Sequence, residues 1–220
     1  MHRVAEDVFQ ISLFPRQALN AYLVGDVIVD AGMPRSAKKV IDAVKGLYVR
    51  AHAITHAHAD HVGGSKAVAD ALDIPVWAPA NDAREVEAGR QVMADTRAKG
   101  ILSRGNGWPP TPVARRLAEG DEVGAGFVVF DAPGHSPGHV VYWREADRTL
   151  VTGDVFFNLN LLTLRPGLHE PPRMLTVDPA RNRISARRLA DLRPALVLFG
   201  HGPPLRDPER LLAFAAARAA

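Results

Sequence analysis

Four side chains that can bind metal ions lie within six residues in the first third of the chain, in the sequence HAHADH that begins at His56. A short apolar run at residues 51–55 precedes them and predicts a strand. Side chains two apart on extended backbone point the same way, so His56 and His58 can face one ion. Asp60 and His61 follow the turn and can face a second ion. These donors include no sulfur, which suits zinc and is also compatible with iron or manganese.

Three later segments repeat this arrangement, because each places a possible metal ligand beside a glycine at the end of an apolar run. They bring His135 in the sequence GHSPGH, Asp154 after Gly153, and His201 between Gly200 and Gly202. Loops that follow neighbouring strands meet at one edge of a sheet, and functional side chains often lie on them. The pattern therefore predicts a metal site built from four separate segments.

The order and spacing of these residues resemble those of the metallo-β-lactamase superfamily over nearly the whole chain. The resemblance implies an α/β fold, an αββα sandwich of two mixed sheets flanked by helices, as one domain over residues 1–220. The ligand set that it implies is His56, His58 and His135 for a first metal, Asp60, His61 and His201 for a second, and Asp154 as the bridge between them. We expect two divalent ions, with zinc as the first choice.

Composition agrees with one domain and limits the partners. A chain of 220 residues that is 47% hydrophobic can bury one substantial core. With 27 basic and 24 acidic residues, the formal net charge of +3 predicts no nucleic-acid partner. The sequence has neither a long apolar run nor a signal-like start, so we expect a cytoplasmic protein without membrane contact. Cys 0 excludes thiolate ligands and fits a reducing compartment. No feature predicts an oligomeric state.

The expected elements alternate between strands and helices. In the first half they are strands at 8–13, 20–24, 27–30, 51–55 and 74–77, and helices at 34–45 and 65–72. In the second half they are strands at 127–130, 140–143, 149–151 and 196–199, and helices that begin at Asp178-Pro179 and Asp207-Pro208. Two groups of strands accompanied by helices predict two stacked sheets with helices outside.

Residues 81–112 depart from this alternation and are a possible lid over the active site. We expect a helix at 81–99 with few large apolar residues, followed by a Gly- and Pro-rich loop at 101–112 that carries Trp108. The segment is either a surface excursion or a lid whose apolar tip is Trp108. The apolar side chains of 156–162 would form a wall opposite that tip. Such a pocket predicts a substrate with an uncharged, apolar acyl group or ring.

Two metal ions about 3.5 to 4 Å apart can share a hydroxide, because metal binding lowers the pKa of water from about 15.7 to about 7. We therefore predict a dinuclear hydrolase in which a metal-bridging hydroxide attacks the carbonyl of an ester, a thioester or a lactone. Asp60 is the predicted catalytic residue, because it can orient the hydroxide or pass its proton onward. The expected partner is a small-molecule substrate.

Several branches of the superfamily remain as alternatives. The lack of cysteine disfavours lactamases with a thiolate ligand. Other lactamases typically lack the bridging aspartate that this chain has. β-Lactam hydrolysis is therefore kept only as an alternative. Acyl-homoserine lactonases resemble the chain in all seven ligands but carry a tyrosine where this chain has Phe157. Glyoxalase II-like thioesterases share the ligands, although their basic glutathione-recognition cluster is not found here. The chain is identified as a glyoxalase II-like or lactonase-like metallohydrolase.

Two other classes of protein also stay open. Oxidoreductases similar to persulfide dioxygenases keep the same motif with one iron. A nucleic-acid-binding role has its only support in the arginines of residues 181–188, which are most simply a solvated helix face. Among the remaining histidines, His139 is expected to support its turn or a ligand, and His52 to lie in the core. His169 lies where it can reach a substrate.

Overall fold

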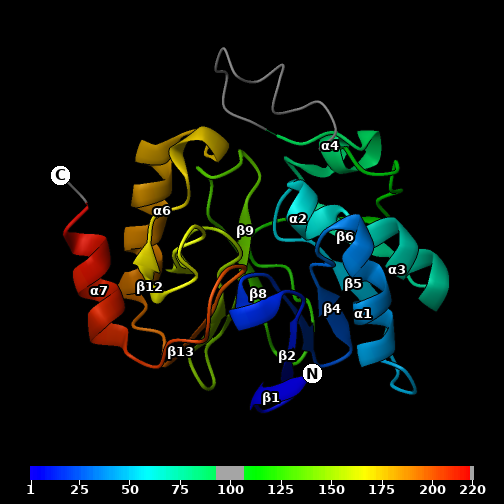
Figure 1. Cartoon of the computed structure of the whole chain (residues 1–220), viewed down its shortest axis with the longest axis horizontal. Helices are drawn as coiled ribbons and strands as arrows, with labels where there is room; N and C mark the ends of the chain where they lie inside the picture. Colours follow the sequence, from blue (N-terminus) through cyan, green and yellow to red (C-terminus); the bar gives the residue numbers. More distant parts are fainter. Residues whose placement is uncertain (93–106, 219–220) are drawn as a thin grey trace.

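Two sheets packed face to face, with helices on their outer sides, make up the part of the chain that the computed structural model describes, residues 1–92 and 107–218 (Figure 1). The first half of the chain supplies a seven-stranded sheet in the order β1-β2-β3-β4-β5-β6-β7. Its strands are β1 (His2–Ala5), β2 (Val8–Ser12), β3 (Asn20–Val24), β4 (Val27–Val29), β5 (Ala51–Ala53), β6 (Val76–Pro79) and β7 (Arg115–Leu117). The accompanying helices are η1 (Pro15–Gln17), η2 (Pro34–Ser36), α1 (Ala37–Ala43), α2 (Ala59–Val62), α3 (Ser65–Leu72) and α4 (Ala83–Ala88).

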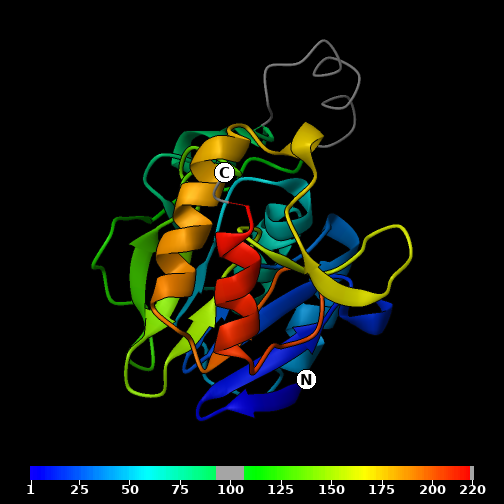
Figure 2. The ribbon, with the colours of Figure 1, turned by 90° about the vertical axis from the view of Figure 1, so that its left-hand side faces the viewer.

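The second half supplies a four-stranded sheet in the order β13-β10-β9-β8 and a separate two-stranded hairpin. The sheet consists of β8 (Val128–Asp131), β9 (Val140–Arg144), β10 (Thr149–Val151) and β13 (Leu196–Leu198), and the hairpin of β11 (Phe157–Leu159) and β12 (Pro166–His169). The helices of this half are η3 (Arg173–Leu175), α6 (Pro179–Asp191) and α7 (Pro208–Ala216). Figure 2 shows α6 and α7 side by side over the outer face of this sheet.

Apolar layers hold the sandwich together. The space between the sheets is filled by one cluster, with Val24 and Ala53 from the first sheet and Tyr142 and Leu198 from the second. Two further clusters lie on the outer faces, one beneath α1 and α3 and one beneath α6 and α7. Because burial of apolar surface stabilises by roughly 25 cal/mol per Å², these layers fix the two halves against each other.

The two long C-terminal helices begin where the sequence predicts. The Asp178 carboxylate accepts a hydrogen bond from the Arg181 backbone N–H, and Asp207 does the same for Arg210. Each aspartate satisfies an N–H group that has no partner within its helix, and a proline fills the next position. In residues 1–92 and 107–218, no helix combines the length and the apolar character needed to cross a membrane.

The topology brings one end of many strands to the same edge. β4, β5 and β6 are parallel neighbours, and β10 is parallel to β13. β8 runs in the same direction as β10, because both are antiparallel to β9. The loops that follow these strands therefore gather at one edge of the sandwich, and the loop between β2 and β3 joins them there. The predicted αββα sandwich of two mixed sheets is confirmed.

The segment 81–112 differs from the prediction in its described parts. Within 81–92, the described part of the helix expected over 81–99, only α4 (Ala83–Ala88) is helical. Trp108 is no exposed tip: its side chain is 5% exposed, packs among core residues and donates its indole N–H to the Val86 carbonyl. Burial of so large a ring with a satisfied donor is more favourable than exposure. Residues 93–106 lie outside the described residues, so the lid stays a prediction.

A buried aspartate connects the loops of the two sheets. The Asp82 carboxylate accepts hydrogen bonds from the Ala57 N–H at 2.9 Å, the Gly138 N–H at 2.7 Å and the Ser136 hydroxyl. A Cβ atom at position 138 would lie 2.5 Å from the Asp82 backbone nitrogen, so only glycine permits this approach. Asp82 therefore holds the HAHADH loop against the GHSPGH loop.

We predict that Asp82→Ala lowers the free energy of unfolding by about 3 kcal/mol or more, because it leaves two buried N–H groups and a hydroxyl without an acceptor. Urea denaturation measures the effect. The matched control is Asp42→Ala, whose carboxylate forms an exposed pair with Lys38 and should change stability by less than about 0.5 kcal/mol. Equal midpoints for the two variants would contradict the role of Asp82.

Candidate metal centre

The structure brings all seven candidate ligands together in two adjoining groups. The members of each group offer donor atoms that lie within 4.8 Å of one another. The first group is His56, His58 and His135, and the second is Asp60, His61, Asp154 and His201. All are buried except Asp60, which is partly exposed. Their grouping follows the division that the sequence analysis inferred, with the four segments meeting at the strand-end edge.

Asp154 lies between the two groups. Its Oδ2 atom is 3.5 Å from His135 Nε2 and 3.3 Å from His201 Nε2, while its Oδ1 atom is 3.2 Å from His61 Nε2. Glycine is required beside it, because a Cβ atom at Gly200 would collide with the Asp154 carboxylate. One carboxylate can thus contact ions on both sides.

Hydrogen bonds on the outer side of the imidazoles determine which nitrogen faces the centre. His58 Nε2 donates to the Val92 carbonyl at 2.6 Å, so its Nδ1 atom is free to face His56 Nε2 at 3.1 Å. His135 Nδ1 pairs with the Thr176 hydroxyl at 3.1 Å, which leaves its Nε2 atom to face the centre. Such partners orient a metal ligand and select its tautomer.

Asp30 performs the same role for His61 and was missed by the sequence analysis, which placed it at the end of a strand. Its carboxylate accepts from His61 Nδ1 at 2.7 Å and from the Thr55 N–H and hydroxyl, both at 2.9 Å. Its backbone adopts a left-handed φ of 59°, which Asp tolerates better than most residues. The signal was present, because Asp30 also ends an apolar strand and Gly32 follows.

The two groups differ in their protonation without a metal. Burial lowers the pKa of His56 and of His135 well below the ordinary value, so both rings are neutral and offer lone pairs. Burial also acts to lower the pKa of His201, but Asp154 and Asp60 outweigh it and raise that pKa to about 10. The second group is therefore an imidazolium–carboxylate cluster, and a metal ion must displace its protons.

The residues present fit two divalent ions. Buried atoms without a hydrogen bond include Nε2 of His61, Nε2 of His135 and Oδ1 of Asp154, and both imidazole nitrogens lie within 3.5 Å of an Asp154 oxygen. Unpaired buried polar atoms are costly, and a bound cation would satisfy them. Imidazole nitrogens and carboxylate oxygens without sulfur suit zinc, iron or manganese.

The other histidines take supporting places. His139 Nε2 accepts a hydrogen bond from the Asp154 backbone N–H at 3.0 Å, and its ring stacks on His56 with 4.7 Å between centroids. His52 lies in the core, with Nε2 at 2.8 Å from the Ser65 hydroxyl. His169 lies on β12, in the hairpin that follows Asp154. His139 thus supports the carboxylate between the groups rather than joining either of them.

The predicted apolar wall after Asp154 is formed by only some of its members. The Phe157 ring lies 4.4 Å from the His201 ring, at the edge of the second group. Phe156 packs against Phe214 of α7 on the other side, and the side chain of Leu162 is 96% exposed. Neighbouring side chains on extended backbone alternate between two faces, so the segment cannot present all of them to one pocket.

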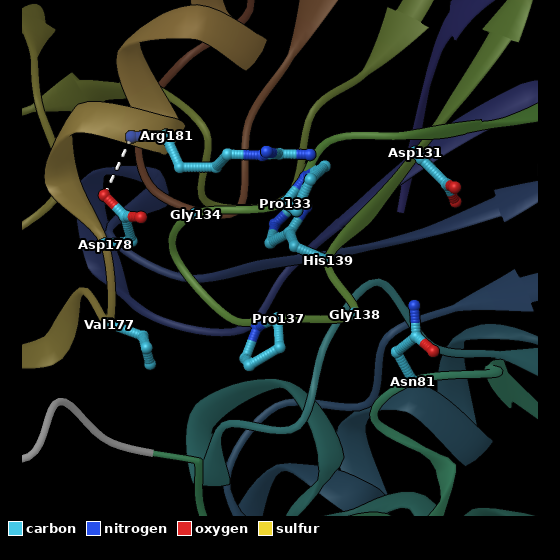
Figure 3. A pocket seen from close by; sticks show the side chains of 10 residues that line it. All are labelled: Asn81, Asp131, Pro133, Gly134, Pro137, Gly138, His139, Val177, Asp178 and Arg181. Carbon is cyan, nitrogen blue, oxygen red and sulfur yellow. Dashed lines mark hydrogen bonds between the residues drawn. The ribbon is translucent and has the colours of Figure 1, made fainter.

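A cavity of about 460 Å³ lies beside the GHSPGH loop (Figure 3). Figure 3 shows the Arg181 side chain of α6 extending across it, with Asn81 on the far side. None of the seven candidate ligands lines it, although His139, which supports Asp154, is among the lining residues. The cavity is a recess behind the loop and not the opening of the metal centre.

Comparison with known proteins identifies the family. The model of the metallo-β-lactamase superfamily matches residues 16–201, so the chain belongs to this superfamily. The probable metallo-hydrolase YybB of Bacillus subtilis is 28% identical over 96% of this chain and 94% of its own length. The probable metallo-hydrolase YqgX of the same organism is 31% identical over 86% of this chain and 87% of its own length. A hydroxyacylglutathione hydrolase of Bdellovibrio bacteriovorus is 32% identical, but over 62% of this chain and 47% of that enzyme.

Solved structures give the same result. The BLEG-1 B3 metallo-β-lactamase superposes with a TM-score of 0.70 at 29% identity, covering 94% of this chain and 96% of that one. TTHA1623, crystallised in a di-iron-bound form, superposes with a TM-score of 0.68 at 31% identity, covering 96% and 98%. The predicted superfamily is therefore confirmed, and the named relatives are metallo-hydrolases.

We predict that metal binding weakens more steeply with falling pH at the second group than at the first. Because the pKa of His201 is raised, its ring is protonated over the neutral range, and each displaced proton costs about tenfold in apparent affinity per pH unit. Zinc titration of metal-free protein between about pH 8 and pH 6, by calorimetry in buffers of different ionisation enthalpy, counts these protons. Parallel pH slopes for both ions would contradict the assignment.

Asp30→Asn should weaken zinc at the second group by about 10- to 100-fold, because the neutral amide supports His61 less well. Competition with a chelator measures the two affinities separately. Asp73→Asn is the matched control, since Asp73 also has a left-handed φ, of 52°, but lies exposed at the end of α3. A similar loss in both variants would show that backbone conformation, and not the contact with His61, is responsible.

Proposed function

We propose that this protein is a dinuclear metal-dependent hydrolase that attacks the carbonyl carbon of a small ester, thioester or lactone and cleaves its acyl C–O or C–S bond with water. The observation that carries the proposal is the position of Asp154, whose carboxylate lies within 3.5 Å of His135 in the first group and of His61 and His201 in the second. A shared carboxylate is the ligand that holds two ions close enough to act on one substrate. Metallo-hydrolases among the relatives support the reaction class.

Each ligand has a proposed place. His56 Nε2, His58 Nδ1 and His135 Nε2 would hold the first ion, Asp60, His61 and His201 would hold the second, and Asp154 would be shared. When bound, such ions lower the pKa of a shared water to about 7 and polarise the substrate carbonyl. The protein's contribution is to hold seven donors in fixed positions, which removes the cost of ordering them during the reaction.

Asp60 is the proposed catalytic residue, because it is the candidate ligand that faces solvent. Its side chain is 36% exposed, and Oδ2 lies 3.3 Å from His201 Nε2. Burial acts to raise the pKa of Asp60, but His61 and His201 outweigh it and hold that pKa well below its ordinary value. Asp60 is therefore ionised at neutral pH. It can accept a proton from a water molecule at the centre, but it carries no proton to donate.

The second group of donors supports this hydrolase, and an oxidoreductase with a single iron, whose members keep the same motif, stays an alternative. A mononuclear enzyme needs the first group alone, whereas here four further donors converge beside it. Zinc is the proposed metal, and iron fits the same donors, as the di-iron form of TTHA1623 illustrates. Similarity to a B3 metallo-β-lactamase gives reason to include β-lactams among the test substrates.

The purified protein should hold two ions and hydrolyse carbonyl substrates in a screen of aryl esters, thioesters, homoserine lactones, β-lactams and phosphodiesters. Asp154→Ala should reduce metal content to at most one ion and lower kcat/KM by about 10³ or more, because the shared ligand is lost. Elemental analysis and initial rates measure both. Asp191→Ala, which removes a surface partner of Arg187, is the control and should retain both ions. Full activity of Asp154→Ala would exclude this mechanism.

A further inference from the structure

A second recess opens at the strand-end edge, on the side of His201. It has a volume of about 940 Å³ and lies between the β2–β3 loop, the β11–β12 hairpin and the chain after His201. Its lining includes His2, Arg16, Gln17, Thr163, Arg165 and Pro203. These residues come from both ends of the chain and from the hairpin that follows Asp154.

Hydrogen bonds attach this recess to the second ligand group. The Ala18 carbonyl accepts from His201 Nδ1 at 2.7 Å, and the Gln17 carbonyl accepts from the Gly202 N–H at 2.8 Å. On the other side, the Asn158 side chain donates to the Pro203 carbonyl at 2.8 Å. The walls of the recess are thus built on the two loops that hold His201 in place.

The recess is basic and its charge is not neutralised. No Asp or Glu is among its described lining residues, and within residues 1–92 and 107–218 neither Arg16 nor Arg165 forms an ion pair. By contrast, Arg183 on α6 pairs with Glu170, and Arg187 pairs with Asp191. Unpaired cations around a concave surface attract anions, and a guanidinium binds a carboxylate or phosphate through two hydrogen bonds.

The loops that carry the arginines have strained backbones. Arg16 and Gln17 have left-handed φ angles of 55° and 58°, and Leu164, beside Arg165, has 54°. For residues other than glycine, this region costs about 1 kcal/mol or more per residue. Such strain persists where surrounding contacts enforce it, and it is concentrated at ligand sites. Here it places both arginines at one recess.

We propose that the substrate of this hydrolase carries an anionic group, a carboxylate or a phosphate, which Arg16 and Arg165 hold while the scissile carbonyl lies at the metal centre. The inference rests on the proposed function, because it names the substrate class of the same site. It replaces the expectation of an uncharged acyl group, since Trp108 is buried in a core cluster and the predicted apolar wall does not form as a whole. Phe157 remains beside the scissile end.

The test compares esters that differ only in their remote end: 4-nitrophenyl hexanoate, its monoadipate analogue with a terminal carboxylate, and an analogue with a terminal phosphonate. The wild type should favour at least one anionic ester over the hexanoate, mainly through a lower KM. Arg16→Gln and Arg165→Gln should each reduce that preference about tenfold, and added salt should reduce it as well. The anion with the larger preference identifies the head group. Arg187→Gln is the control and should retain the full preference.

Binding of adipate itself separates this proposal from the proposed function. Calorimetry on the metal-loaded protein compares the wild type with the double variant Arg16→Gln/Arg165→Gln. Any binding of adipate to the metals is common to both proteins and cancels in the comparison. A loss of affinity of about tenfold or more supports the anion site, even if no ester is hydrolysed. If the hexanoate and the anionic esters are cleaved equally well and adipate binds both proteins equally, the hydrolase stands and the anion site is overturned.

Discussion

The rest of the centre depends on a carboxylate buried among imidazoles. Asp154 is almost fully removed from solvent, and a buried ionised carboxylate costs several kcal/mol unless cations surround it. His61 and His201 supply that positive charge as imidazolium rings when no metal is bound, which holds the pKa of Asp154 well below its usual range. Metal ions supply it when they displace those protons. The same electrostatic demand therefore keeps the centre assembled in either state, which explains why the sheet edge tolerates so polar an interior.

The hydrogen bonds that orient the ligands reach outward, because four of the five candidate ligand imidazoles are oriented by a residue of another element. His201 contacts the Ala18 carbonyl, His135 contacts Thr176, and His58 contacts the Val92 carbonyl. These partners lie between 34 and 183 residues away along the chain. The metal centre is consequently the place where the two sheets, the loop after α4 and the start of the chain are joined, and its geometry is a property of the whole fold.

The sequence predicts this fold and its seven candidate ligands because both signals are local. Ligand spacing, glycines at strand ends and the Asp-Pro helix starts are legible within a few residues. The direction in which Trp108 packs, and the role of Asp30, depend on contacts made across the chain, and they were missed. The wall predicted after Asp154 is incomplete, because a run of apolar residues does not show which side chains alternate toward the core.

Under the proposed function, chemistry and specificity are assigned to different parts of the molecule. The candidate ligands follow strands whose positions are fixed by the apolar layers, so members of the superfamily can keep them while their substrates change. The basic recess is formed by loops that carry residues with left-handed backbone, such as Arg16. Loops of this kind vary at little cost to the core. The resemblance of this chain to metallo-hydrolases therefore supports the proposed reaction class, and the arginines of its own loops support the proposed anionic substrate.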